Sequence, residues 1–283
     1  MLKRIITAIV ALIVFIPILV FSDTWIFPAA ISACAVIGTV EMLGCIGQRK
    51  NLFITIPLCL VAAFFPIYFR YTALYTHDLH GAITLGMGIS FLVALYIFGV
   101  AVFANKSLSV TDAGLIFATS FYIVAAFTSI EYIYDFIGNG KYIYLLTFIT
   151  AWVTDSFAYF SGRLLGKHKL IPAVSPKKTV EGAIGGVVFC VISMVVFGLV
   201  IENFFNAEGT IVANYPILAI SGIFISVVSQ IGDLIMSVIK RHYGIKDYGK
   251  LFPGHGGILD RFDSVIAVTL ILAFITTYFN LLA

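Results

Sequence analysis

Charge is what this sequence has least of. Of its 283 residues only 11% are charged, whereas 61% are hydrophobic and the mean hydropathy is +1.07. Soluble domains usually carry about a quarter charged residues, so 17 basic and 14 acidic side chains are too few to cover a soluble fold of this length. The composition excludes a soluble enzyme and a disordered chain, and it predicts an integral membrane protein.

Cysteine is scarce as well, which excludes a scaffold held together by disulfides. The four cysteines lie in or beside apolar runs, and none forms a CxxC or Cys/His pattern that would predict a metal or redox site. We expect them to be small apolar residues within the membrane. Alternation of apolar and polar residues is also lacking, so the sequence does not resemble a transmembrane β-barrel.

Long apolar runs are what the sequence has instead. A spanning helix needs about 20 mainly apolar residues. Nine runs meet this requirement, and we read the first as a retained helix: 4–21, 25–46, 52–70, 81–104, 111–134, 142–163, 180–201, 214–240 and 257–282. The prediction is an all-α, polytopic membrane helix bundle. We divide it into an N-terminal transmembrane scaffold of about five helices (1–140) and a C-terminal catalytic region of about four helices and two cytoplasmic loops (141–283).

The placement of the basic residues predicts the orientation. With the N-terminus in the cytoplasm and nine spans, 15 of the 17 Lys and Arg residues fall on the cytoplasmic side. Only Arg70 and Lys141 fall on the other side, as the positive-inside rule requires. We therefore expect a cytoplasmic N-terminus and a C-terminus on the opposite side. Ten basic residues gather in 163–178 and 240–261, where attraction to anionic lipid headgroups is the simplest alternative explanation.

Acidic residues inside the predicted spans are the first functional signal, because a charge at membrane depth is unfavourable and by default marks a site. Four aspartates lie near the cytoplasmic ends of their spans: Asp155, Asp233, Asp260 and Asp263. Helical spacing places Gln230, Asp233, Ser237 and Lys240 on one face. The competing interpretation is inert pairing of these aspartates with Lys or Arg. Glu41 is the weakest candidate, and we expect it at a helix interface or at the membrane edge.

Two loops carry features that suit phosphate binding. The run Ser175-Pro176-Lys177-Lys178-Thr179 leads into Glu181 at the start of a span, and a helix N-terminus beside two lysines favours an anion. Ordinary capping by Thr179 and Glu181 is the alternative. The run Pro253-Gly254-His255-Gly256-Gly257 opens the last span in a similar way, because glycines let a backbone approach a ligand closely. His255 is either a phosphate donor or a polar loop residue.

These features together predict a class of reaction. Mg²⁺ prefers a few carboxylates combined with substrate phosphates, and here acids lie beneath lysines, arginines and two helix N-termini at headgroup level. The arrangement indicates phosphoryl or nucleotidyl transfer to a lipid headgroup. No Walker A, GxSxG or HExxH motif is present, and Gly162-Arg-Leu-Leu-Gly166-Lys167 has the wrong spacing for a phosphate-binding loop.

The stretch from Ser237 to Asp263, SVIKRHYGIKDYGKLFPGHGGILDRFD, resembles the signature of the phosphatidate cytidylyltransferases, or CDP-diacylglycerol synthases. Upstream, Asp155-Ser156 through Gly162-Arg163, Ser175 through Gly182, and Gln230-x-Gly232-Asp233 also resemble this family. The resemblance is dense from about residue 150 to 264, and the first 140 residues match only as hydrophobic spans. It implies that CTP and phosphatidate are converted to CDP-diacylglycerol and pyrophosphate with Mg²⁺, and that Asp233 and Asp260 are metal ligands.

On this basis we assign roles as hypotheses. The catalytic residues are Asp233, Asp260, Lys177, Lys178 and Arg261, and the substrate-binding residues are Ser175, Thr179, Ser237, Lys240, Arg241, His255, Gly256 and Gly257. Asp233 and Asp260 bind one or two cations, and Asp263 is a further ligand or orients Arg261. We expect membrane lipids but no nucleic acid as partners, and the cytoplasmic (inner) membrane of a bacterium as the location, with the site facing the cytoplasm.

Two other functions would also use acidic residues within the membrane. A CTP-dependent polyprenol or phytol kinase would share these acids but transfer the γ-phosphoryl group, and the complete signature argues against it. An ion-coupled transporter would place its acids near the midplane and often shows repeat symmetry, which this sequence lacks. Gly182-x-x-x-Gly186 permits close helix packing within one chain or between two copies, so a homodimer stays open.

Overall fold

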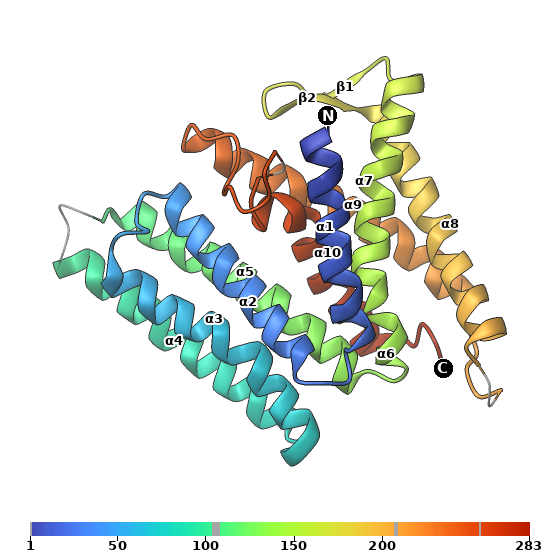
Figure 1. Cartoon of the computed structure of the whole chain (residues 1–283), viewed down its shortest axis with the longest axis horizontal. Coiled ribbons are helices and arrows are strands. Elements are labelled where there is room, and N and C mark those ends of the chain that lie inside the picture. Colours follow the sequence, from blue (N-terminus) through green and yellow to red (C-terminus); the bar gives the residue numbers. More distant parts are fainter. Residues whose placement is uncertain (1, 104–107, 207–208, 255) are drawn as a thin grey trace. The chain divides into compact units, whose positions relative to one another are not determined.

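The computed structural model describes residues 2–103, 108–206, 209–254 and 256–283. The chain divides into two compact units, each built from two stretches of sequence. The first unit comprises Met1–Glu131 and Tyr243–Arg261, and the second comprises Tyr132–His242 and Phe262–Ala283. Almost every described element is a helix (Figure 1), as expected where the bilayer offers the backbone no hydrogen-bonding partners.

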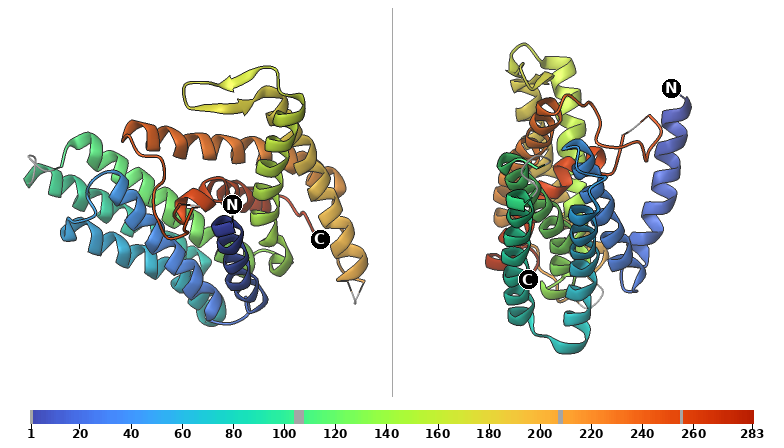
Figure 2. Two further views of the ribbon diagram at one scale, coloured as in Figure 1. Left: turned by 45° about the horizontal axis from the view of Figure 1, so that its top comes forward. Right: turned by 90° about the vertical axis from the view of Figure 1, so that its left-hand side faces the viewer.

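The first unit consists of long helices made from continuous apolar runs. They are α1 (Leu2–Val20), α2 (Ile26–Cys45), α3 (Leu52–Tyr71), which continues into the π-helix η1 (Thr72–Thr76), α4 (Leu79–Phe103) and the first part of α5 (Val110–Phe136). Figures 1 and 2 show α2, α3 and α4 running side by side. α2 packs closely on α3, where the Ser32 hydroxyl donates to the carbonyl of Ala63 at 2.9 Å.

The second unit contains the remaining helices and a short sheet. After α6 (Gly140–Ile143) come α7 (Leu145–Leu165), β1 (Lys169–Ile171), β2 (Ser175–Thr179), α8 (Val180–Phe204), α9 (Tyr215–His242) and α10 (Leu259–Tyr278), which enters this unit at Phe262. α8 packs against both α7 and α9. These three helices position most of the polar side chains considered below.

Small residues bring α7 and α8 into close contact. A Cβ atom on Gly182 would lie 2.6 Å from the carbonyl oxygen of Ala158, and one on Gly186 would lie 3.1 Å from that of Thr154. The Gly182-x-x-x-Gly186 pattern therefore packs two helices of the same chain, in the way that small residues permit close approach of membrane helices. Of the two possibilities given for this pattern, packing within one chain or between two copies, the structure shows the first.

The segment 164–179, which the sequence indicated only as a loop, contains a β-hairpin. β1 pairs antiparallel with β2, with Lys169 opposite Thr179 and Ile171 opposite Ser175. The hairpin lies at the end of α7 and leads directly into α8 (Figures 1 and 2). It fixes where the polar run from Ser175 to Thr179 lies relative to the helices of the second unit.

The helices agree with the predicted spans. Among the described residues, seven helical segments are long and apolar enough to cross a membrane: Ile26–Cys45, Leu52–Thr76, Leu79–Phe103, Val110–Phe136, Gly140–Leu165, Val180–Phe204 and Tyr215–His242. The chain is thus an integral membrane protein that is helical apart from the short β1–β2 hairpin. Helices also occupy the other two predicted ranges, as α1 and α10, while nine crossings and their orientation remain predictions.

Candidate functional site

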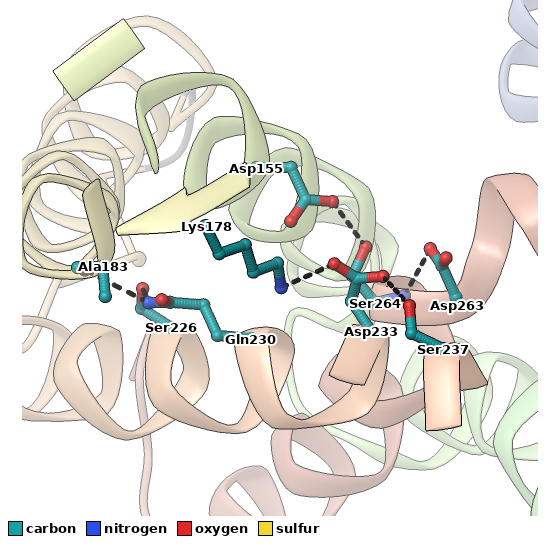
Figure 3. Close-up of polar contacts among 9 residues, drawn as sticks. All are labelled: Asp155, Lys178, Ala183, Ser226, Gln230, Asp233, Ser237, Asp263 and Ser264. Carbon is teal, nitrogen blue, oxygen red and sulfur yellow. Dashed lines mark hydrogen bonds and ion pairs between the residues drawn. The ribbon is translucent and has the colours of Figure 1, made fainter. Parts of the chain in front are cut away.

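Asp233 is the centre of a polar cluster in the second unit. The Nζ atom of Lys178, on β2, lies 2.6 Å from Asp233 Oδ2, and each of these side chains is 24% exposed. The hydroxyl of Ser237, one turn further along α9, donates to Asp233 Oδ1 at 3.4 Å. Figure 3 shows Asp233 between these two partners. The spacing that predicted a shared face for Asp233 and Ser237 is confirmed.

Two further aspartates lie in the same region, and one serine links them. The Ser264 hydroxyl donates to Asp155 Oδ2 at 2.8 Å, which connects α10 to α7. The backbone N–H of Ser264 donates to Asp263 Oδ1 at 3.0 Å. In Figure 3 the carboxylates of Asp155 and Asp233 lie near the Lys178 ammonium group, and that of Asp263 lies on the other side of Asp233. Three half-buried acids and one lysine, carried by α7, α9, α10 and β2, form an electronegative cluster.

The donor atoms of this cluster suit a hard cation. Carboxylate and hydroxyl oxygens are the ligands that Mg²⁺ takes from proteins, and it completes its octahedral shell with water and substrate phosphates. Within the ranges that the structure describes, no three His, Cys, Asp or Glu side chains form a complete metal-binding group. Asp155, Asp233 and Asp263 nevertheless supply oxygen atoms of the type that Mg²⁺ takes.

Gln230 shares this face of α9 and has a structural contact. Its Nε2 group donates to the carbonyl of Ala183 on α8 at 3.2 Å and to the hydroxyl of Ser226 at 3.4 Å. Ser226 in turn lies 3.2 Å from the Thr154 hydroxyl of α7. This chain of contacts ties α7, α8 and α9 together and so holds two of the helices that carry the acids. Figure 3 shows the part of it around Gln230, to the left of Asp233.

The hairpin places its candidate residues differently. Lys177 is exposed, Lys178 points to Asp233, and Ser175 is half-buried at the start of β2. The Thr179 hydroxyl accepts the N–H of Gly182 at 3.1 Å and so caps α8, which is the capping alternative noted for the sequence. The Glu181 carboxylate accepts the N–H of His168 and lies 2.7 Å from its Nδ1, which anchors the hairpin to α8.

Asp260 lies in the first unit, at the start of α10, and its side chain is 8% exposed. Its Oδ2 accepts the backbone N–H of Tyr248 at 2.7 Å and that of Gly257 at 2.9 Å. Gly256 has a φ of +85°, and a Cβ atom there would lie 2.5 Å from Asp260 Oδ2. The glycine run predicted for ligand binding thus also wraps the carboxylate of Asp260.

The segment that carries this turn is fixed at its beginning. The Tyr243 hydroxyl donates to Asp112 Oδ1, on α5, at 2.8 Å. Burial, and then this hydrogen bond, raise the pKa of the Tyr243 hydroxyl above its usual range. The hydroxyl therefore stays protonated and able to donate throughout the physiological range.

The other basic candidates lie at the end of α9 and at the start of α10. Lys240 is buried in the last turn of α9, Arg241 next to it is exposed, and Arg261 is exposed in the first turn of α10. His255 lies outside the described residues. Gly257 is buried against the first turn of α10. The substrate contacts assigned to these residues stay predictions.

Sequence reasoning assigned no site role to three residues that the structure places in these clusters. Asp155 was noted only as an acid within a span, yet it joins α7 to α10 through Ser264. Ser264 carries no signal beyond its position one turn after Asp260. Glu41 binds the start of α10, and its only signal was being an isolated acid in a long apolar run.

Comparison with known proteins places the chain among enzymes. The sequence profile of the cytidylyltransferase family matches residues 2–279. A protein of Staphylococcus saprophyticus named phosphatidate cytidylyltransferase is 36% identical, over 94% of this chain and 95% of its own length. Proteins of the same name are 34% identical in Staphylococcus haemolyticus, over 94% of this chain and 95% of the relative, and 37% identical in Bacillus subtilis, over 69% of each chain.

Proposed function

The chain belongs to the cytidylyltransferase family, and from this premise we propose that it transfers the cytidylyl group of CTP to phosphatidate. The products are CDP-diacylglycerol and pyrophosphate. The observation that carries the proposal is the contact of 2.6 Å between Lys178 and Asp233, with Asp155 and Asp263 beside it. Such a cluster supplies both the oxygen ligands and the positive charge that a reaction between two polyanions needs.

The reaction requires little proton transfer. A phosphate oxygen of phosphatidate is anionic near neutral pH and attacks the α-phosphorus of CTP. A new P–O bond forms to the lipid phosphate, and the bond from the α-phosphorus to the bridging oxygen of the β-phosphate breaks, so that pyrophosphate leaves with its electrons. The protein lowers the barrier mainly by positioning the two substrates and neutralising their charge.

In this proposal, basic residues neutralise the charge of the substrate phosphates, and all of them except Arg261 belong to the second unit. Lys178 is held by Asp233 and exchanges this carboxylate for a substrate phosphate. Lys177 is exposed on the same strand and binds phosphate oxygens, as Ser175 does with its hydroxyl. Lys240, Arg241 and Arg261 add positive charge for the triphosphate or the lipid phosphate. The alternating side-chain directions of a strand place Lys177 and Lys178 on opposite faces, so they serve different phosphate groups.

Magnesium, when bound, neutralises the phosphate charge that develops as pyrophosphate departs. Asp233 and Asp260 are the proposed ligands, and Asp263 is the third candidate. Asp260 and Asp263 lie one turn apart on the same helix, α10. The Ser237 hydroxyl orients the carboxylate of Asp233, and the backbone N–H groups of Tyr248 and Gly257 orient that of Asp260.

The proposal is tested with purified protein in detergent micelles that contain phosphatidate, with CTP added. We expect CDP-diacylglycerol, identified by mass spectrometry, and one pyrophosphate for each molecule of lipid product. Release of CDP together with a newly phosphorylated lipid would contradict the proposal and indicate a CTP-dependent lipid kinase.

Removal of divalent cations is expected to abolish the activity. Protein treated with EDTA and transferred to metal-free buffer should form no lipid product, because the aspartates alone would repel the triphosphate. Millimolar Mg²⁺ should restore the rate, whereas an equal concentration of NaCl should not. A rate that survives chelation unchanged would contradict the metal assignment.

We propose that the nine helices cross the cytoplasmic membrane of a bacterium, with the N-terminus and the polar clusters on the cytoplasmic side. The support is the bias of the basic residues. In a background without the four native cysteines, Lys141→Cys should react with a membrane-impermeant maleimide on intact cells, and Lys169→Cys should react only after permeabilisation. The reverse pattern, or equal labelling of both, would contradict this orientation.

A further inference from the structure

Glu41 makes a contact within the first unit that no part of the proposed reaction explains. It lies on α2, and its side chain is 9% exposed. Its Oε1 accepts the N–H of Ile258 at 3.0 Å, and its Oε2 accepts the N–H of Leu259 at 2.9 Å. One carboxylate therefore binds two successive N–H groups at the N-terminus of α10, where neither group has a partner within the helix.

The backbone around this carboxylate is shaped to admit it. A Cβ atom on Gly249 or on Gly257 would collide with Glu41 Oε1. A Cβ atom on Gly257 would also collide with Oε2, so any larger residue would displace both oxygens. The two glycines thus form a pocket for the carboxylate between the loop and the first turn of α10. This close approach explains the glycine at position 257 independently of any substrate.

The same turn holds Asp260. The N–H of Gly257, next to the two groups bound by Glu41, donates to Asp260 Oδ2 at 2.9 Å. Glu41 thus fixes residues 257–259 from one side while Asp260 accepts from the same turn. We propose that Glu41 is a positioning residue that sets the direction of the Asp260 carboxylate for cation binding. This inference rests on the proposed function, because it assigns Asp260 to the metal.

The chemistry of the contact requires a carboxylate of this length. Glutamine has one acceptor oxygen, so its NH₂ group would face the N–H of Ile258 or Leu259 and one hydrogen bond would be lost. Aspartate is one methylene shorter and cannot reach both groups from the same position on α2. The negative charge also stabilises the positive end of the α10 dipole. Glu41→Gln therefore loosens the turn without creating a cavity.

The experiment compares wild type with Glu41→Gln by three measurements. Hydrogen exchange at the amides of residues 257–259 should become faster in the variant. Direct binding of Mn²⁺, followed by EPR without substrate, should weaken by about 10- to 100-fold, the range typical of groups that orient a metal ligand. The rate of CDP-diacylglycerol formation should fall by a similar factor at low Mg²⁺ and recover in part at high Mg²⁺.

Asp78→Asn is the matched control. Asp78 accepts the N–H of Gly81 at 2.8 Å at the start of α4, so this substitution also removes an acid from a helix N-terminus of the first unit. It should leave Mn²⁺ binding and the rate unchanged. Should Glu41→Gln fail to fold, Gly249→Ala tests the same contact, because its Cβ displaces the Glu41 carboxylate and should weaken Mn²⁺ binding in the same direction.

The outcomes separate this inference from the proposed function. Unchanged Mn²⁺ affinity in a folded Glu41→Gln variant would overturn the positioning role, as would faster exchange at 257–259 that leaves metal binding intact. A wild-type protein that binds Mn²⁺ but forms no lipid product would instead contradict the proposed function. The exchange and EPR measurements are independent of turnover, so the two failures are distinguishable.

Discussion

Replacing Asp233 with asparagine is expected to lower kcat for CDP-diacylglycerol formation by about 100- to 1000-fold, the effect typical of removing one preorganised electrostatic group from an active site. Asparagine has the same shape, so packing on α9 is retained. It lacks the negative charge that holds Lys178 at 2.6 Å and that a cation requires. The rate is measured with saturating CTP and Mg²⁺, and thermal unfolding in detergent verifies the fold.

Glu202→Gln is the control for this variant. Glu202 lies near the end of α8 in the same unit, and its carboxylate accepts a hydrogen bond from the Tyr215 hydroxyl. Removing this charge tests whether any acid lost from the second unit impairs the enzyme. We expect a rate within about twofold of wild type, since Glu202 lies at the opposite end of α8 from Lys178. Near-normal activity of Asp233→Asn would remove Asp233 from the mechanism.

Asp260→Asn is expected to lower kcat by a similar factor of about 100-fold or more. The asparagine oxygen can still accept from Tyr248 and Gly257, so the turn at the start of α10 should persist. The variant therefore isolates the loss of charge from a loss of structure. Mn²⁺ binding, measured by EPR in the absence of substrate, should weaken together with the rate.

Asp23→Asn serves as the control in the first unit, because Asp23 is an exposed acid in the turn between α1 and α2. It should leave both the rate and Mn²⁺ binding unchanged.

Asp263→Asn should lower the rate less than Asp260→Asn does if Asp263 orients Arg261, and equally if Asp263 is a metal ligand. Full activity of a folded Asp260→Asn variant would contradict the metal assignment.

The helices could be predicted from the sequence because each is determined by local composition. Runs such as 52–70 and 180–201 are long and apolar, and in a bilayer only a helix satisfies their backbone groups. The face shared by Asp233 and Ser237 could also be predicted, because positions four residues apart on a helix are neighbours. Both properties depend on a few adjacent residues and need no knowledge of the tertiary structure.

Contacts between distant segments could not be predicted in the same way. The contact of Lys178 with Asp233 depends on the β1–β2 hairpin. Its strands have only three and five residues, so the sequence gives little indication that they form. Glu41 meets Ile258 and Leu259 across more than 200 residues of sequence. The sequence predicted a helix interface or the membrane edge for Glu41, and the interface with α10 is confirmed. Which N–H groups Glu41 binds is decided by the packing of α2 against the start of α10, which the sequence does not show.

For the site residues, too, the sequence indicated the position but not the contact. Thr179 could be read as a phosphate ligand or as a cap, because both roles use the same hydroxyl beside a helix N-terminus, and the structure shows the cap. Asp155 had an unusual position but no assignable partner until Ser264 was placed 2.8 Å away. Charge in an apolar run therefore indicates which residues matter, while packing decides what each of them does.

The most direct measurement uses two preparations of CTP, one labelled at the α-phosphate and the other at the γ-phosphate. Each is incubated with purified protein, phosphatidate and Mg²⁺, and the label in the lipid fraction is counted. The proposed cytidylyl transfer predicts labelled lipid from α-labelled CTP alone, with the γ-label recovered in pyrophosphate. Label that enters the lipid from the γ-position, or from neither, would contradict the account.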